Sequence, residues 1–181
     1  VQADSNMNLD FTQKREDLIV VTDSTERMPG LSNACVSFQN SHNNKSHFFY
    51  VNLEPQPNGA AFAGFKVKKP FDLSDYYQVR LKLKNLVDVP FQAQFVISTK
   101  DSDFNGFTYK ATFVLNDTIR TKIALPFGDF EPTRRGEPYP NAPAMDLNNV
   151  TSMGIMIVGR PAPNLRQKGV FALQLEEFSF Q

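Results

Sequence analysis

The chain has 181 residues, of which 41% are hydrophobic and 21% are charged, and its 19 basic and 19 acidic residues give a formal net charge of zero. This balance argues against a nucleic-acid partner bound through a broad basic surface. A local basic patch stays possible, because a net charge of zero does not determine where the charges lie on the surface. No apolar run approaches the roughly 20 residues of a transmembrane helix. We therefore expect a single globular domain over residues 1–181.

Segments in which apolar and polar residues alternate recur along the chain, whereas helical periodicity is scarce. A period of two is typical of strands with one face on a core and the other in water. The predicted strands are 17–22, 34–38, 47–53, 61–68, 79–84, 91–99, 107–115, 119–125, 153–158 and 170–180. Many short strands without intervening helices predict an all-β fold, an antiparallel β-sandwich or jelly roll.

Three connections between the predicted strands stand out. Residues 70–77 and 145–152 have the composition of one-turn helices or wide connections that close a sandwich. The segment 128–144 holds four prolines and is the longest irregular stretch. A connection of that length in a compact domain is either functional or mobile.

The stretch KDSDFNGF contains Asp101, Asp103 and Asn105 at alternate positions, followed by Gly106, as in the first half of a calcium-binding loop. An EF-hand loop also needs a glutamate at its twelfth position and flanking helices. The twelfth residue is Thr112, and the flanks are predicted strands. We therefore expect a hairpin loop first, with a calcium site built from these three residues and another loop as the alternative; no other cofactor is indicated.

Residue types that commonly carry catalysis are few. His42 and His47 are the only histidines, and we expect them in a loop and at a strand edge. The single cysteine, Cys35, lies on a predicted strand, and we expect a packed core thiol. Glu176 and Glu177 are adjacent on another predicted strand, where neighbouring side chains point to opposite faces, so they should not form an acid/base pair. We therefore predict that the protein is not an enzyme.

The long segment 128–144 supplies the best candidates for a ligand or partner contact. Arg134, Arg135, Glu137 and Tyr139 lie close together in it. Arginine and tyrosine are favoured at protein interfaces because they combine contact area with directed hydrogen bonds.

Three Asn-x-Ser/Thr sequons, at Asn44, Asn116 and Asn149, are candidate N-glycosylation sites. If a leader sequence has been removed before Val1, these sequons are compatible with a secreted glycoprotein. A β-sandwich of this kind could bind carbohydrate, but sugar sites favour flat aromatic platforms and the chain has no tryptophan. We expect the tyrosines that could serve, Tyr76, Tyr77, Tyr109 and Tyr139, to be core or rim residues.

An ordered set of phrases runs through residues 60–181. They are Asp72-Leu73-Ser74 before a strand, Leu125 to Phe130 in the form hydrophobic-P-F-x-x-F, Leu147 to Gly154, and a final strand from Gly169 to Leu175. In this order and spacing the chain resembles the complex I intermediate-associated protein 30 family, whose domain is a galactose-binding-like jelly roll. It departs from the family pattern by lacking a tryptophan at residues 119–121.

This resemblance implies a non-catalytic, chaperone-like assembly module that contacts protein partners of a respiratory or photosynthetic complex, and it implies a mitochondrial location. The alternative is a secreted, glycosylated β-sandwich that binds a ligand such as a carbohydrate. The two hypotheses differ in compartment and in the class of molecule bound. The sequence leaves the oligomeric state open.

Overall fold

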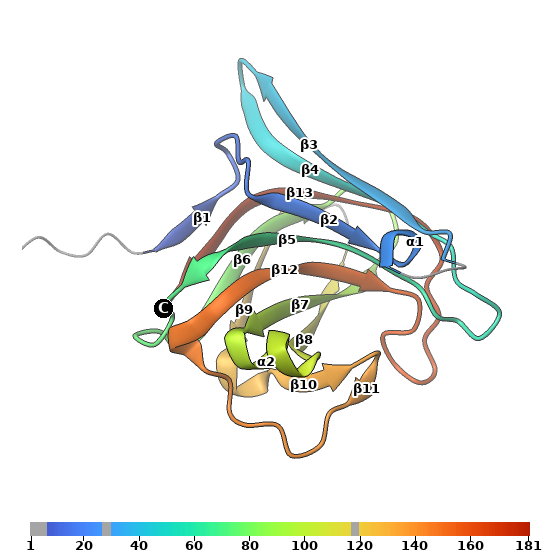
Figure 1. The fold of residues 1–181 in the computed structure, drawn as a ribbon. Helices are drawn as coiled ribbons and strands as arrows, with labels where there is room; N and C mark the ends of the chain where they lie inside the picture. The colour runs from blue at the N-terminus through green and yellow to red at the C-terminus, as the bar shows by residue number, and fades with distance from the viewer. Residues whose placement is uncertain (1–6, 27–29, 117–119) are drawn as a thin grey trace, which may run out of the picture.

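The protein consists of two antiparallel β-sheets packed face to face (Figure 1). The computed structural model describes residues 7–26, 30–116 and 120–181. The sheet that we call the β13 sheet has the strand order β3-β4-β13-β6-β9, with β1 also paired to β13. The other, the β12 sheet, has the order β11-β10-β8-β7-β12-β5-β2.

The chain passes repeatedly from one sheet to the other, in places after two or three consecutive strands of the same sheet. The β13 sheet contains β1 (Asn8–Asp10), β3 (Asn33–Ser41), β4 (Asn44–Leu53), β6 (Gln78–Asn85), β9 (Arg120–Pro126) and β13 (Gly169–Phe180). The β12 sheet contains β2 (Leu18–Thr22), β5 (Phe62–Phe71), β7 (Phe91–Thr99), β8 (Thr108–Leu115), β10 (Glu131–Arg134), β11 (Glu137–Pro138) and β12 (Val150–Val158). The short helices are α1 (Asp23–Glu26), α2 (Lys100–Asn105), and the 3-10 turns η1 (Phe127–Asp129) and η2 (Leu147–Asn149).

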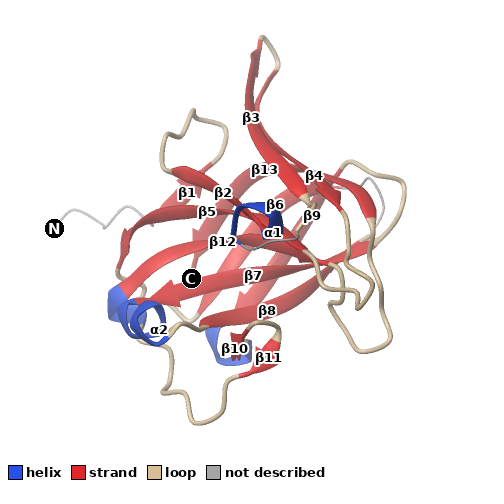
Figure 2. Ribbon diagram, turned by 45° about the vertical axis from the view of Figure 1, so that its right-hand side comes forward, coloured by secondary structure: helices blue, strands red, loops and turns tan. Residues whose placement is uncertain are grey.

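Strands dominate the ribbon of Figure 2, and every strand predicted from the sequence is present. This confirms the predicted antiparallel β-sandwich. The β3–β4 hairpin extends beyond the rest of the sandwich in both views (Figures 1 and 2). No helix in the described ranges is long and apolar enough to cross a membrane.

The core between the sheets is rich in phenylalanine, and Phe178 on β13 lies near its centre. Its ring centroid is 4.6 Å from that of Phe11, 5.2 Å from that of Phe95 and 6.4 Å from that of Phe65. Phe178, Phe11 and Phe95 are 0% exposed. Large rings fill the gap of about 10 Å between two facing sheets, and edge-to-face pairs add to the stabilisation from burial.

The connection between β7 and β8 differs from the simple polar loop that we predicted. The two strands pair as expected, but the connection is the short helix α2. Thr99 caps its N-terminus, with Ser102 reciprocating in a capping box, and Gly106 ends it with a left-handed φ of 72°. Thr-x-x-Ser followed by glycine is a helix start and stop signal. The prediction of a simple loop was therefore wrong, because these residues favour a short helix.

The thiol of Cys35 is exposed, so the prediction of a packed core cysteine was wrong. Cys35 lies opposite Tyr50 in the β3–β4 register, whereas Ala34 and Val36 lie opposite the buried residues Val51 and Phe49. Side chains on a strand alternate between faces. The apolar neighbours therefore take the core face and leave the cysteine outside.

The segment 128–144 carries the hairpin β10–β11 at the edge of the β12 sheet. Arg134 pairs with Glu137, and the two residues between them, Arg135 and Gly136, have φ values of 51° and 81°. Positive φ at both central residues is the geometry of a type I′ hairpin turn, which matches the natural twist of paired strands. The predicted irregular segment therefore contains two short strands.

We predict that Phe178→Ala lowers the free energy of unfolding by about 3–5 kcal/mol, because it leaves a cavity among fully buried rings. Chemical denaturation measures this loss. The matched control is Phe104→Ala, since Phe104 on α2 is 90% exposed. That control should change stability by less than about 0.5 kcal/mol. Equal effects of the two substitutions would contradict the central role of Phe178.

Candidate functional site

Two of the four predicted contact residues in segment 128–144 hold α2 in place. The Arg134 guanidinium donates to the carbonyl of Gly106 at 3.1 Å and to that of Asn105. It also lies 4.5 Å from the ring centroid of Tyr139, and that ring stacks on Phe107 at 4.4 Å. Arg134 therefore caps the carbonyl end of the helix, as cations at helix C-termini do.

The other two predicted contact residues, Arg135 and Glu137, are exposed at the tip of the β10–β11 hairpin. In this position their side chains are accessible to a partner. Their role in a contact stays a prediction.

The three candidate calcium ligands lie together on α2, but their side chains have different partners. The Asn105 amide donates to both the carbonyl and the carboxylate of Asp101 at 3.0 Å. The Asp103 carboxylate accepts a hydrogen bond of 2.6 Å from the Thr151 hydroxyl. Among the described residues there is no group of three His, Cys, Asp or Glu side chains placed to hold a metal ion. Calcium binding at this helix stays a prediction.

The two histidines occupy different environments. His42 is exposed in the turn of the β3–β4 hairpin, whereas His47 on β4 is 2% exposed. His47 Nδ1 lies 2.8 Å from the carbonyl of Phe11, and Nε2 accepts from the backbone N–H of Arg15 at 3.4 Å. Because both ring nitrogens contact backbone groups, the ring has a structural role.

The sequon asparagines lie in three different settings. Asn44 and Asn116 are exposed, and Asn149 is partly buried, with its amide donating to Asp146 at 2.8 Å. Residues 117–119, which include the rest of the Asn116 sequon, lie outside the described residues. Glycosylation at these asparagines stays a prediction.

The outer face of the β13 sheet carries a set of polar side chains that sequence reasoning did not bring together. A β-bulge between Leu175 and Glu177 produces part of it. Leu175 and Phe178 both point into the core, so the two residues between them, Glu176 and Glu177, both lie on the outer face. The expectation that the two glutamates point to opposite faces was therefore wrong. The spacing of three between the apolar residues Leu175 and Phe178, in place of two, is the signal that could have revealed it.

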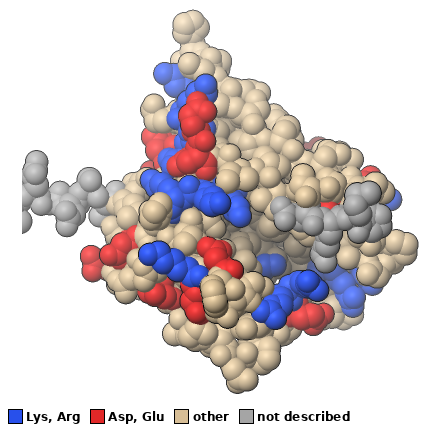
Figure 3. Space-filling view, in the orientation of Figure 1, with Lys and Arg blue, Asp and Glu red and all other residues tan. Residues whose placement is uncertain are grey.

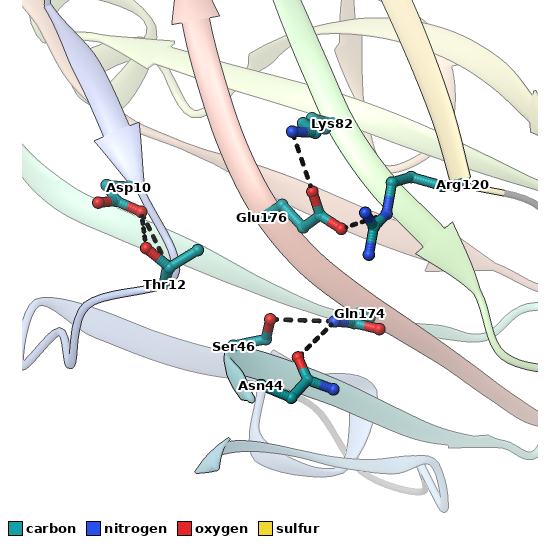
Figure 4. Close-up of polar contacts among 8 residues, drawn as sticks. All are labelled: Asp10, Thr12, Asn44, Ser46, Lys82, Arg120, Gln174 and Glu176. Carbon is teal, nitrogen blue, oxygen red and sulfur yellow. Dashed lines mark hydrogen bonds and ion pairs between the residues drawn. The ribbon is translucent and has the colours of Figure 1, made fainter. Parts of the chain in front are cut away.

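Gln174 and its neighbours form the first half of this face (Figure 4). Its amide nitrogen donates to the Asn44 side-chain oxygen at 3.2 Å and to the Ser46 hydroxyl at 3.0 Å. Gln174 is 6% exposed and Ser46 is 2% exposed, although both lie on the side of the sheet away from the core. Because each group is held by the next, their orientations are fixed before any ligand arrives.

Glu176 on β13 lies at the centre of the second half, and its side chain contacts residues of β6 and β9 (Figure 4). Its carboxylate oxygens are 3.4 Å from Lys82 Nζ and 2.6 Å from Arg120 Nε. The Glu176 side chain is 10% exposed, whereas those of Lys82 and Arg120 are 43% and 59% exposed. A sheltered carboxylate thus forms ion pairs with two accessible cations.

The aromatic side chains on this face are Phe48 and Tyr50 of β4. Their rings are nearly parallel, with centroids 6.4 Å apart and an interplanar angle of 14°. Phe48 is 8% exposed, and Tyr50 is partly exposed. Tyr50 was not among the tyrosines that we considered as sugar platforms. Of those, Tyr109 is 3% exposed, and burial, with smaller contributions from Asp101 and Asp146, raises the pKa of its hydroxyl.

Lys110 is a lysine with a lowered pKa on the outer face of the β12 sheet. It lies on β8, opposite Val96 of β7 and Glu131 of β10. Burial lowers the pKa of its ammonium group, because the charged form loses hydration.

On the face seen in Figure 3, positive and negative side chains are interspersed.

The fold and this face define the class of protein: a two-sheet β-sandwich module with a polar face held in place by side-chain contacts. Both helices belong to the opposite sheet, since α1 packs beside β2, and α2 beside β7 and β8. The sequence profile of the complex I intermediate-associated protein 30 (CIA30) family matches residues 9–175. The chain belongs to this family, as the order of its sequence phrases predicted. A search of curated proteins found no match.

Solved structures similar to this chain include carbohydrate-binding modules. A family 11 carbohydrate-binding module from Clostridium thermocellum, in complex with a beta-1,3-1,4-mixed-linked tetrasaccharide, has a TM-score of 0.70 at 14% identity, covering 98% of this chain and 97% of that chain. The family 11 module of the cellulosomal cellulase Lic26A-Cel5E of the same organism has a TM-score of 0.68 at 12% identity, covering 99% and 97%. An exo-beta-agarase has a TM-score of 0.58 at 9% identity, covering 98% of this chain and 25% of that chain. At these identities the likeness is one of fold alone.

We predict that Glu176→Gln lowers the free energy of unfolding by about 1–2 kcal/mol, because it removes the carboxylate between Lys82 and Arg120. Added salt should recover part of the loss by screening the cations that remain. Glu177→Gln is the matched control, since this neighbour makes no ion pair with a described residue. Urea denaturation at two salt concentrations measures both variants. A loss that does not depend on salt would contradict the electrostatic explanation.

We predict that Lys110→Met raises the free energy of unfolding at pH 7 by about 1 kcal/mol, because the fold no longer has to shelter a charge. The lowered pKa fixes the sign of the pH dependence. The cost of the charged lysine is complete below the folded pKa and is relieved as pH rises from there toward the ordinary value of 10.5. The gap between variant and wild type should therefore narrow in that window. Lys66→Met, on β5 of the same sheet, is the control, and a gap that stays constant up to pH 10.5 would contradict the prediction.

Proposed function

We propose that this protein is a non-catalytic binding module that recognises a protein partner through the outer face of the β13 sheet. The observation that carries the proposal is the fixed polar network on that face. Gln174 and Glu176 are 6% and 8% exposed, yet they lie away from the core and hold Asn44, Lys82 and Arg120 in place. Groups that are already ordered lose little conformational entropy when a partner binds.

Membership of the CIA30 family supports a role in assembly. The family description names intermediates of complex I, so the partner we propose is a protein subunit of a respiratory complex or of a related assembly, and the location we propose is mitochondrial. The exposed residues Arg135 and Glu137 on the β10–β11 hairpin provide a second contact. The proposal of a non-catalytic role is supported by the use of His47 as a structural group.

Carbohydrate binding is the second candidate function. It is favoured by the fold shared with the family 11 carbohydrate-binding module that was solved with a mixed-linked tetrasaccharide. Amide, hydroxyl and carboxylate groups such as Gln174, Ser46 and Glu176 can also bond sugar hydroxyls. In this alternative the protein is secreted and glycosylated at Asn44, Asn116 or Asn149. The small exposure of Phe48 leaves Tyr50 as the only accessible ring of that aromatic pair, which favours the protein partner.

Site-specific photo-crosslinking tests the proposed function. A benzophenone amino acid replaces Lys122, which is exposed on the outer face of the β13 sheet, or Val114, which is 49% exposed on the outer face of the β12 sheet. Each variant is irradiated in extract from cells that express the protein, and adducts are identified by mass spectrometry. We expect the Lys122 position to give a discrete adduct with a subunit of an oligomeric complex, and an excess of unlabelled wild type to suppress it.

Two outcomes would contradict the proposal. Equal adducts from the Lys122 and Val114 positions would show that the outer face of the β13 sheet is not selective. Binding of a mixed-linked glucan oligosaccharide in calorimetry, lost when Tyr50 and Gln174 are replaced by alanine, would establish the carbohydrate alternative.

A further inference from the structure

Five basic side chains line up on two adjacent strands of the β13 sheet. β6 carries Arg80, Lys82 and Lys84 on the outer face, and β9 carries Arg120 and Lys122. In the antiparallel register Lys82 lies opposite Lys122, and Lys84 lies opposite Arg120. Like charges directly opposite each other on paired strands destabilise a sheet. We call these five residues the basic face.

The protein itself balances only part of this charge. Glu176 pairs with Lys82 and Arg120. Arg80, Lys84 and Lys122 have no carboxylate within 4.0 Å among the residues that the structure describes. A chain with a net charge of zero therefore concentrates unpaired positive charge on one face.

The basic face is also hollowed. A depression of about 420 Å³ has Arg80, Lys82 and Lys122 among its lining residues, together with Ala124, Ser179 and Glu177. This volume lies within the range of about 300–1,000 Å³ typical of ligand sites. Charged groups are therefore arranged around a concave surface and not on a flat one.

We infer that the basic face binds an extended acidic segment of the protein partner, one that carries a carboxylate at every second residue. This rests on the proposed function and names the chemistry of the segment that is bound. Residues two apart on a strand are separated by about 6.8 Å, and alternate side chains of an extended peptide have the same period. Arg80, Lys82 and Lys84 thus match three alternating carboxylates of a peptide that lies along β6. Arg120 and Lys122, about 4.8 Å away on the neighbouring strand, contact the same carboxylates from the side.

Two features favour an acidic peptide over other polyanions. The rings on this sheet face, Phe48 and Tyr50, are on β4, which is separated from β6 by β13, so none of the basic side chains is paired with a base-stacking platform. The carboxylates of Glu176 and Glu177 also lie beside the cations and would repel a continuous row of phosphates or sulfates. A peptide can place neutral side chains and backbone N–H groups next to them.

The test uses the double variant Lys84→Glu/Lys122→Glu with Lys66→Glu/Lys68→Glu as the matched control. The control residues lie on β5 of the opposite sheet, and both double variants change the net charge by the same amount. The probe is a synthetic peptide of five Glu-Thr repeats, titrated at about 50 mM salt and followed by NMR. We expect wild type and control to bind with affinities within about twofold of each other, with shifts on β6 and β9. Binding to Lys84→Glu/Lys122→Glu should be at least tenfold weaker.

Other probes decide between classes of ligand. A peptide of five Lys-Thr repeats should not bind wild type. Failure of the Glu-Thr peptide to bind wild type would overturn the inference. So would a heparin oligosaccharide or oligo-dT that binds more tightly than the peptide and with the same sensitivity to Lys84→Glu/Lys122→Glu.

Crosslinking separates failure of this inference from failure of the proposed function. The benzophenone is placed at Tyr50, outside the basic face, in each double variant. Loss of the partner adduct in Lys84→Glu/Lys122→Glu alone supports the inference. A competable adduct that persists in both double variants would keep the proposed function and overturn the acidic segment.

Discussion

The bulge in β13 is the constraint on which the rest of the structure depends. β13 pairs with β4, β6 and β1, and five of its large apolar residues reach the core: Phe171, Leu173, Leu175, Phe178 and Phe180. Leu175 and Phe178 do so only because one extra residue sits between them, which shifts the alternation of the strand by one position. The shift places Phe178 among Phe11, Phe65 and Phe95, and it leaves Glu176 outside between Lys82 and Arg120. Core packing and outer-face electrostatics therefore have one common cause.

The two faces of strands β6 and β9 have opposite effects on the stability of the sheet. The inner side chains of β6, Val79, Leu81 and Leu83, are at most 1% exposed and hold the strand in the sandwich. Its outer side chains bring like charges together with those of β9, which opposes pairing. The sheet tolerates this because burial on the inner face outweighs the repulsion, and because Glu176 offsets part of it. Residues that destabilise a sheet and bring the fold no compensating stabilisation are expected at functional surfaces.

Sequence reasoning located every long strand, because alternation is a local property that each segment carries by itself. Strands β1, β10 and β11 were missed since each has four residues or fewer, too short to show a period. The basic face was missed for a different reason. The residues of VRLKLK and IRTKIAL become neighbours only through the pairing of β6 with β9, and pairing between distant segments is not encoded in either segment alone. The Leu175-to-Phe178 spacing was visible in the sequence, but its effect on Glu176 and Glu177 required the position of the core.

The neutral net charge of the chain determines how its basic face can act. Charges on the rest of the surface cancel the cluster at long range, and at physiological salt the screening length is only about 8 Å. A distant polyanion therefore experiences little attraction, and a ligand gains from Arg80, Lys84 and Lys122 only when it lies directly against β6 and β9. Selection at such short range depends on how well the charges of the ligand match the strand period of the face, more than on how many charges the ligand carries. A neutral protein with a dense local cluster of basic side chains is thus suited to recognising one spacing of negative charges in a partner. A generally basic protein would bind any anion.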